Sequence, residues 1–293
     1  MTLFHVIILA IVQGFAELLP ISSSAHVIVA EELMGMNPAA PQMTLLLVML
    51  HTGTMFAVIV YFWNRWRRAY FQSVAQFRKF AIAVIFATFL TGLIGGGLIE
   101  GIEHVLFRNQ AHAWVEQLFG HLNLIAPALA AGGILILAAG LLEKRQRGAN
   151  PGAKPGASSE MTMKQTGIIG AVQGLCLPFR GFSRSGATIS AGMLSGVAKA
   201  RAEDFSFALA VAITPAAIAR ELYRLIQMQH IHHGTRLAFE VLPSVLGAFF
   251  AFLAGLVALK WLSRWLESGR WYIFGIYCLF AACVVGYLYH AGF

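Results

Sequence analysis

The sequence contains few charged residues for its length. Charged side chains make up only 12% of its 293 residues, and 58% are hydrophobic, whereas soluble domains carry about 25% charged residues. The mean hydropathy is +0.70. This composition excludes an ordinary soluble enzyme and predicts an all-α protein that crosses a membrane several times.

Cysteines are also scarce. Cys176, Cys278 and Cys283 lie inside apolar segments, with neither metal-ligand spacing nor a disulfide pattern. No basic region precedes the first apolar run, which starts at Leu3, so no cleaved signal peptide is expected. The net charge of +8 comes from Lys and Arg in short loops, which favours membrane orientation over nucleic-acid binding.

Two stretches, 3–34 and 166–197, each hold a pair of apolar segments interrupted by polar residues. A membrane-spanning helix needs about 20 apolar residues, and neither arm of either pair reaches that length comfortably. Each stretch therefore predicts a re-entrant helix pair whose polar turn is buried in protein or faces water. The turns are Pro20-Ile21-Ser22-Ser23-Ser24 and Gly181-Phe182-Ser183-Arg184-Ser185.

Longer apolar spans follow each re-entrant pair. They are predicted near 44–63, 80–99 and 122–142, and again near 205–226, 241–262 and 272–289. Between the two sets, residues 148–163 are rich in Gly, Pro, Ala and Ser and predict a linker. We therefore predict two halves, 1–147 and 164–293.

The two halves open in the same way, with Val12-Gln13-Gly14 in the first and Val172-Gln173-Gly174 in the second. Basic residues in the loops predict opposite orientations for the two halves. This is the inverted-repeat plan, in which the broken helices meet near the midplane. The basic loops are expected to lie in the cytoplasm. The basic residues that set this orientation are Arg65, Arg67, Arg68, Arg78, Lys79, Lys144, Arg145, Arg147, Lys154, Lys164, Lys199, Arg201, Lys260, Arg264 and Arg270.

The first turn holds candidate catalytic groups. Gln13 and Glu17 are four residues apart and share a helical face, and a carboxylate inside the membrane is a functional candidate by default. Ser22, Ser23 and His26 follow, and their spacing allows a hydroxyl to meet the imidazole. The alternative is a serine that caps the helix and a histidine bonded to a backbone carbonyl.

The second turn has the residues of an anion site. Ser183 is placed to cap a helix that carries Arg184 and Thr188, so free amides, a guanidinium and hydroxyls would converge on a phosphate. Gly181 would allow a close backbone approach. The alternative is that Arg184 only neutralises Glu17. On the long spans, His51 with Thr52 and Thr54 is a weaker candidate for lining the cavity.

These motifs closely resemble those of the bacterial undecaprenyl-pyrophosphate phosphatases of the bacitracin-resistance family. The resemblance rests on Gln13-x-x-x-Glu17, on Pro20-Ile-Ser-Ser-Ser-Ala-His26 and on Gly181-Phe-Ser-Arg-Ser-Gly-Ala-Thr188, and it covers nearly the whole chain. It implies a multi-pass enzyme of the bacterial inner membrane that removes the terminal phosphate of undecaprenyl pyrophosphate, recycling the lipid carrier of cell-wall synthesis. Together with the basic loops, the resemblance also implies a site that opens to the outer side of the membrane.

The resemblance also implies roles for single residues. Ser23 falls on the proposed nucleophile, His26 on the essential histidine and Glu17 on an acidic position, while Gln13 falls on a position that accepts Glu or Gln. Ser183, Arg184, Ser185 and Thr188 fall on the phosphate-binding motif. A divalent cation, Mg2+ or Ca2+, would attach to Glu17, with Gln13 as a second ligand, and to the pyrophosphate.

One position departs from the family pattern. Arg180 stands before Gly181 where the family usually has proline, and it becomes an additional candidate for binding the pyrophosphate. A water nucleophile remains an alternative to Ser23, and a homodimer is compatible with the sequence. The rival function is a transporter or flippase of an anionic polyprenyl lipid, because inverted repeats with broken helices are also a transporter plan.

Overall fold

The structure is a computed structural model, and the residues that it describes are helical, without strands, apart from short turns. It describes residues 2–36, 41–106, 122–149, 161–231, 237–267 and 269–291. The short helices are α1 (Leu3–Leu18), α2 (Ser23–Leu33), α6 (Met163–Cys176) and α7 (Arg184–Leu194). The long helices are α3 (Pro41–Tyr70), α4 (Val74–Leu106), α5 (Leu122–Ala149), α8 (Lys199–Ile231), α9 (Leu237–Glu267) and α10 (Tyr272–His290).

The six long helices are long and apolar enough to cross a membrane, which confirms an all-α polytopic protein. They run past the predicted apolar spans at most of their ends, and the span predicted at 80–99 lies within the longer α4. The reason is that a helix continues beyond the hydrocarbon layer into the polar interface. The predicted linker is shorter at both ends, because Gly148 and Ala149 still belong to α5 and Met163 begins α6; residues 150–160 lie outside the described part.

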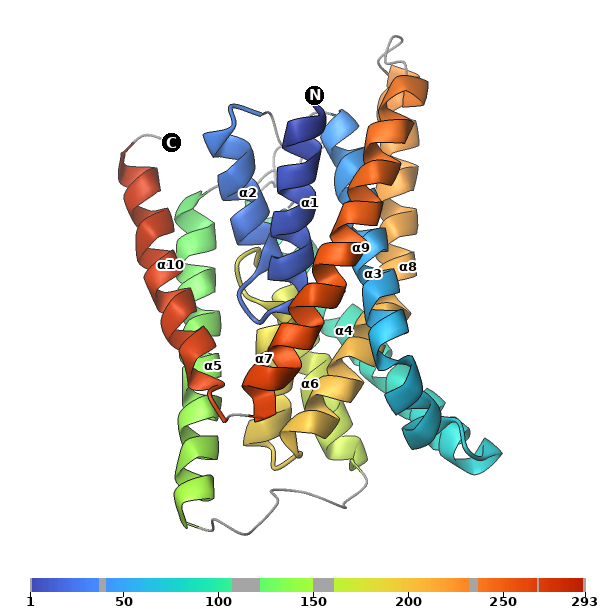
Figure 1. Cartoon of the computed structure of the whole chain (residues 1–293), viewed down its shortest axis with the longest axis vertical. Coiled ribbons are helices and arrows are strands. Elements are labelled where there is room, and N and C mark those ends of the chain that lie inside the picture. The colour runs from blue at the N-terminus through green and yellow to red at the C-terminus, as the bar shows by residue number, and fades with distance from the viewer. Residues whose placement is uncertain are drawn as a thin grey trace.

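The two short helix pairs point toward each other along the long axis of the molecule. In Figure 1, α1 and α2 lie in the upper half and α6 and α7 in the lower half. A hydrogen bond from the Gly181 amide to Ser24 Oγ, 3.3 Å long, joins the two turns directly. Both predicted pairs of short helices joined by a polar turn are therefore present, while their re-entrant path through the membrane stays a prediction.

The repeated Val-Gln-Gly sequences make matching contacts. A Cβ added at Gly14 would lie 2.5 Å from Ala254 Cβ, and one added at Gly174 would lie 3.0 Å from the Thr91 carbonyl oxygen. The first glycine thus packs α1 against α9, and the second packs α6 against α4. Small residues permit such close helix crossings. These contacts agree with two related halves, while the division into inverted repeats stays a prediction.

Apolar side chains surround the meeting point of the turns. Leu18, Ile125, Ile189 and Phe207 are at most 1% exposed there, and they belong to one core cluster. This core holds the two turns in place. The α3–α4 and α7–α8 connections and the C-terminal end of α5 lie in the lower half of the view (Figure 1).

Candidate active site

The first turn is held in an unusual backbone conformation. Proline cannot donate a backbone hydrogen bond, and α1 ends two residues before Pro20. Ser22 then takes a φ of 70°, and it is the one non-glycine residue with positive φ among the described residues. The helix α2 begins directly afterwards, at Ser23. The turn therefore places the Ser23 side chain beside the last turn of α1.

The second turn has the capped helix start that the sequence predicts. Ser183 Oγ accepts a hydrogen bond from the Gly186 amide at 3.3 Å, and α7 begins at Arg184. Gly181 has a φ of 104°, and a Cβ there would lie 2.6 Å from the Ile125 carbonyl oxygen. Only glycine fits both the backbone angle and this close approach.

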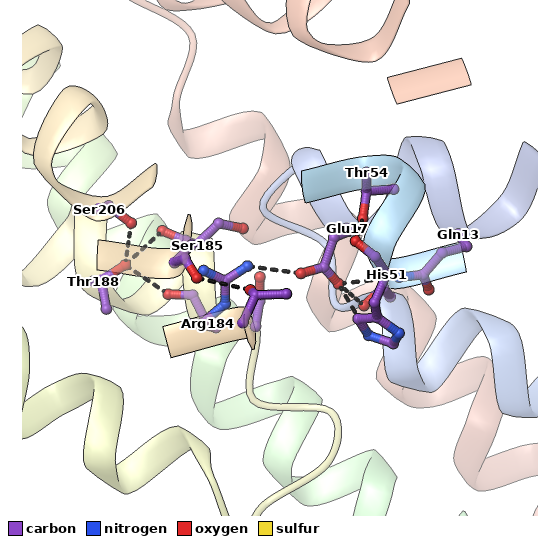
Figure 2. A network of polar contacts seen from close by, with 12 residues as sticks. Gln13, Glu17, His51, Thr54, Arg184, Ser185, Thr188 and Ser206 are labelled. Carbon is purple, nitrogen blue, oxygen red and sulfur yellow. Dashed lines mark hydrogen bonds and ion pairs between the residues drawn. The ribbon is translucent and has the colours of Figure 1, made fainter. Parts of the chain in front are cut away.

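Glu17 lies at the centre of the contacts between the turns (Figure 2). Its Oε1 is 2.6 Å from Arg184 Nη2, and its Oε2 accepts a hydrogen bond from Ser23 Oγ at 2.5 Å. Gln13 Nε2 also donates to Oε2, at 3.4 Å, and His51 Nε2 lies 3.9 Å from the same oxygen. The carboxylate therefore connects the predicted nucleophile with the predicted phosphate-binding arginine.

Arg184 has a second nitrogen that is not engaged. Its Nη1 is buried and has no hydrogen-bond partner among the described residues, whereas its Nη2 is held by Glu17. The alternative that Arg184 pairs with Glu17 is thus correct for one half of the guanidinium. The other half is a buried donor, and leaving such a donor without an acceptor is costly. An anion that entered the site would satisfy it.

A cavity of about 110 Å³ lies between the turns. The charged residues that line it are Glu17, Arg180 and Arg184, so its lining carries a net positive charge. Hydroxyl groups come from both turns. The remaining lining residues are Ala16, Ser22, Ser23, Ser24, Cys176, Phe179, Phe182, Ser183 and Ser185.

Two predicted phosphate-binding hydroxyls have partners in the protein. Thr188 Oγ1 donates to the Arg184 carbonyl at 2.7 Å and lies 2.6 Å from Ser206 Oγ (Figure 2). Ser185 Oγ donates to the Leu19 carbonyl at 3.4 Å, across the two turns. In this structure both side chains fix the position of α7, and their binding to phosphate stays a prediction.

His26 and the serines do not pair as the spacing suggested. His26 Nδ1 is 2.7 Å from the Ser22 carbonyl oxygen, and Nε2 is 2.7 Å from Tyr277 Oη of α10. The Ser23 hydroxyl points instead to Glu17. Of the alternative reading, the histidine bonded to a backbone carbonyl is present, whereas the serine cap is not, because Ser22 makes no side-chain capping bond. A catalytic role for His26 stays a prediction.

The cavity has one carboxylate to offer a metal ion. Within the described part of the chain, no group of three or more His, Cys, Asp or Glu side chains could hold a metal. The two oxygens of Glu17 already accept from Arg184 and Ser23. The residues present therefore fit Mg2+ or Ca2+ only when substrate oxygens complete the coordination, which is how Mg2+ is often bound.

Comparison with known proteins supports the resemblance seen in the motifs. The sequence profile described as Bacitracin resistance protein BacA matches residues 6–284. The chain belongs to this family. Undecaprenyl-diphosphatase 2 of Acinetobacter baylyi is 55% identical to this BacA family member over 288 residues, 97% of each chain. Two Burkholderia proteins are 34% identical over 99% of each chain: undecaprenyl-diphosphatase 2 of B. thailandensis and undecaprenyl-diphosphatase 1 of B. pseudomallei.

Three contacts of this family member are not evident from the motifs alone. His51 reaches Glu17 from α3, and its signal was weak, namely polar residues within an apolar span. The contact of Tyr277 with His26 spans 251 positions of sequence, and no local pattern marks it. Ser24, which joins the turns through Gly181, was visible only as part of a serine run.

Proposed function

We propose that this protein hydrolyses undecaprenyl pyrophosphate to undecaprenyl phosphate and inorganic phosphate, and that it thereby gives resistance to bacitracin. The observation that carries the proposal is the chain of contacts from Ser23 through Glu17 to Arg184, whose Nη1 is buried and has no partner in the described part of the chain. This arrangement has a nucleophile, a proton acceptor and an anion site within one cavity. The family and the names of the relatives point to the same reaction.

The phosphate-binding half is formed by the second turn. In our proposal, Arg184 Nη1 and the α7 N-terminus hold the terminal phosphate, since a guanidinium and free amides both favour a phosphate anion. Arg180, which also lines the cavity, then neutralises the second phosphate. The replacement of proline by Arg180 thus adds a positive charge where the pyrophosphate binds.

The reacting half is formed by the first turn. Ser23 Oγ attacks the terminal phosphorus, the bond from that phosphorus to the bridging oxygen breaks, and undecaprenyl phosphate leaves. The serine proton passes to Glu17, which accepts the Ser23 hydrogen bond. Water then attacks the phosphoserine, inorganic phosphate leaves, and the proton returns to Ser23. Because phosphoryl transfer depends mainly on positioning and charge neutralisation, Arg184 matters as much as the nucleophile.

A divalent cation is part of the proposal. The Glu17 carboxylate and the side-chain amide oxygen of Gln13 would hold the cation together with the pyrophosphate oxygens. When bound, Mg2+ or Ca2+ would neutralise phosphate charge. We place the protein in the bacterial inner membrane with the basic loops in the cytoplasm and the site open to the outer side, because Lys and Arg favour cytoplasmic loops.

The rival function, transport of an anionic lipid, requires the anion site but not the nucleophile. The short Ser23 to Glu17 hydrogen bond is of no use to a carrier and favours the hydrolase. The site, rather than the fold, separates the two functions, because one fold can support both hydrolysis and transport.

The test is release of inorganic phosphate from undecaprenyl pyrophosphate by the purified protein in detergent, where no gradient exists. We expect multiple turnovers by the wild type and at least a thousandfold loss in Glu17→Ala, as for removal of a catalytic group. The matched control is Glu100→Ala, because Glu100 is exposed on α4. A wild-type protein that releases no phosphate, or a Glu17→Ala variant that stays active, would overturn the proposal.

A further inference from the structure

Both ring nitrogens of His26 have partners in the protein. A carbonyl oxygen can only accept, so Nδ1 must carry the hydrogen that bonds Ser22 at 2.7 Å. The neutral ring then presents the Nε2 lone pair to Tyr277, whose hydroxyl donates at 2.7 Å. The two rings lie nearly parallel, at 12°, with their centroids 5.7 Å apart.

The Ser22 carbonyl belongs to the most unusual backbone position of the first turn. A non-glycine residue with positive φ is strained and persists only when its surroundings hold it. The Ser22 side chain makes no capping bond to α2. The His26 ring is therefore a restraint on this residue, and the next residue along the chain is Ser23, whose hydroxyl must reach Glu17.

Tyr277 is carried by a firmly packed part of α10. Two residues before it, a Cβ at Gly275 would lie 2.6 Å from the Leu137 amide nitrogen, so α10 touches α5 closely. One residue after it, Cys278 Sγ donates to the Pro20 carbonyl at 3.4 Å. Anchors on both sides thus fix Tyr277 relative to the first turn.

We propose that Tyr277 is a positioning residue of the phosphatase site. Its hydroxyl holds the His26 ring, and the ring holds the Ser22 carbonyl, so that Ser23 stays against Glu17. This inference rests on the proposed function and deepens it. It assigns His26 to the geometry of the turn, whereas Glu17 accepts the proton of Ser23.

The first test compares Tyr277→Phe with wild type in the phosphate-release assay. Phenylalanine keeps the ring and removes only the hydroxyl. We expect kcat to fall about tenfold, which corresponds to ~1.4 kcal/mol of transition-state stabilisation, with KM within about twofold because Arg184 is untouched. Tyr287→Phe is the matched control, since Tyr287 is on the same helix and 72% exposed, and it should behave as wild type. Equal kcat in Tyr277→Phe and wild type would overturn the proposal.

A double-mutant cycle separates positioning through His26 from a general structural effect. In a His26→Gln background, Tyr277→Phe should lower the residual kcat by less than about twofold, because the restraint is already broken. If the two losses multiply, Tyr277 acts by another route and the proposal is wrong. The thermal unfolding midpoints of Tyr277→Phe and Tyr287→Phe should also agree.

A spectroscopic measurement tests the contact without relying on turnover. In protein with 15N-labelled histidine, the signals that disappear in His26→Gln belong to His26. They should show the Nδ1–H tautomer, and Tyr277→Phe should shift the Nε2 signal. An unchanged Nε2 signal would overturn the positioning role even in an active enzyme. Absence of phosphate release by wild type, with the Nε2 shift present, would instead count against the proposed function alone.

Discussion

Replacement of Arg184 by lysine separates the two tasks of its guanidinium. Nη2 holds Glu17 at 2.6 Å, and Nη1 is buried without a hydrogen-bond partner among the residues that the structure describes. Lysine keeps the positive charge but has a single nitrogen, so it cannot form both contacts in the fixed geometry of an arginine fork. Arg184→Lys can therefore keep the pair with Glu17 or bind phosphate, but it cannot do both.

The expected loss follows from the number of donors removed. Loss of one preorganised donor to a developing negative charge costs about 10²–10³ in kcat, or roughly 2.7–4 kcal/mol. Because the charge that attracts the substrate remains, KM should change much less than kcat. We therefore expect Arg184→Lys to lose at least a hundredfold in kcat, and Arg184→Ala to lose all measurable phosphate release.

The assay is steady-state phosphate release by the purified variants in detergent. Arg78→Lys is the control, because Arg78 is exposed on α4, and it should match wild type. Thermal unfolding of each variant confirms that the fold is kept. An Arg184→Lys variant within tenfold of the wild-type kcat would refute the two-contact role of this arginine.

Three further predictions concern the fold and the cation. Gly181→Ala should lower the free energy of unfolding by about 2 kcal/mol or more, because the new Cβ meets the Ile125 carbonyl oxygen at positive φ. The control is Gly92→Ala, which has open space around the new Cβ and should not destabilise the protein in thermal unfolding. Lys199→Ala removes one partner of buried Glu143, at 2.9 Å, and should lower the free energy of unfolding by about 1.5–3 kcal/mol, as for loss of a hydrogen bond to a charged group; an unchanged thermal midpoint would contradict this. Removal of divalent cations with a chelator should reduce phosphate release at least tenfold, with recovery on adding Mg2+ or Ca2+, and a full rate in chelator would argue against the cation.

Much of the fold follows from the sequence because apolar length is a strong constraint in membranes. The two segments interrupted at Pro20 and near Gly181 were too short to span, and the structure turns back at both places. The ends of the long helices were less predictable. The helix α4 begins at Val74 and ends at Leu106, beyond the predicted span at both ends. It continues through polar residues such as Lys79 and Glu100, where hydropathy no longer reports its presence.

The site was predictable in its residues and less so in its contacts. The charge of Glu17 at membrane depth and the arginine in the second turn pointed to a meeting of the two turns, and they do meet. The contact of His26 with Tyr277 could not be predicted from the sequence. Helical spacing places Ser23 near His26, but the ring rotates to the Ser22 carbonyl and to Tyr277, which depends on the packing of α10.

The most direct measurement follows the terminal phosphate through a single turnover. Undecaprenyl pyrophosphate labelled in its terminal phosphate is mixed with excess purified enzyme, and the reaction is quenched in acid at successive times. The protein is then digested and analysed by mass spectrometry. Our account predicts a phosphate that appears transiently on Ser23 and is absent in Ser23→Ala, which also loses phosphate release. Full phosphate release by Ser23→Ala, with no label on the protein at any time, would contradict it.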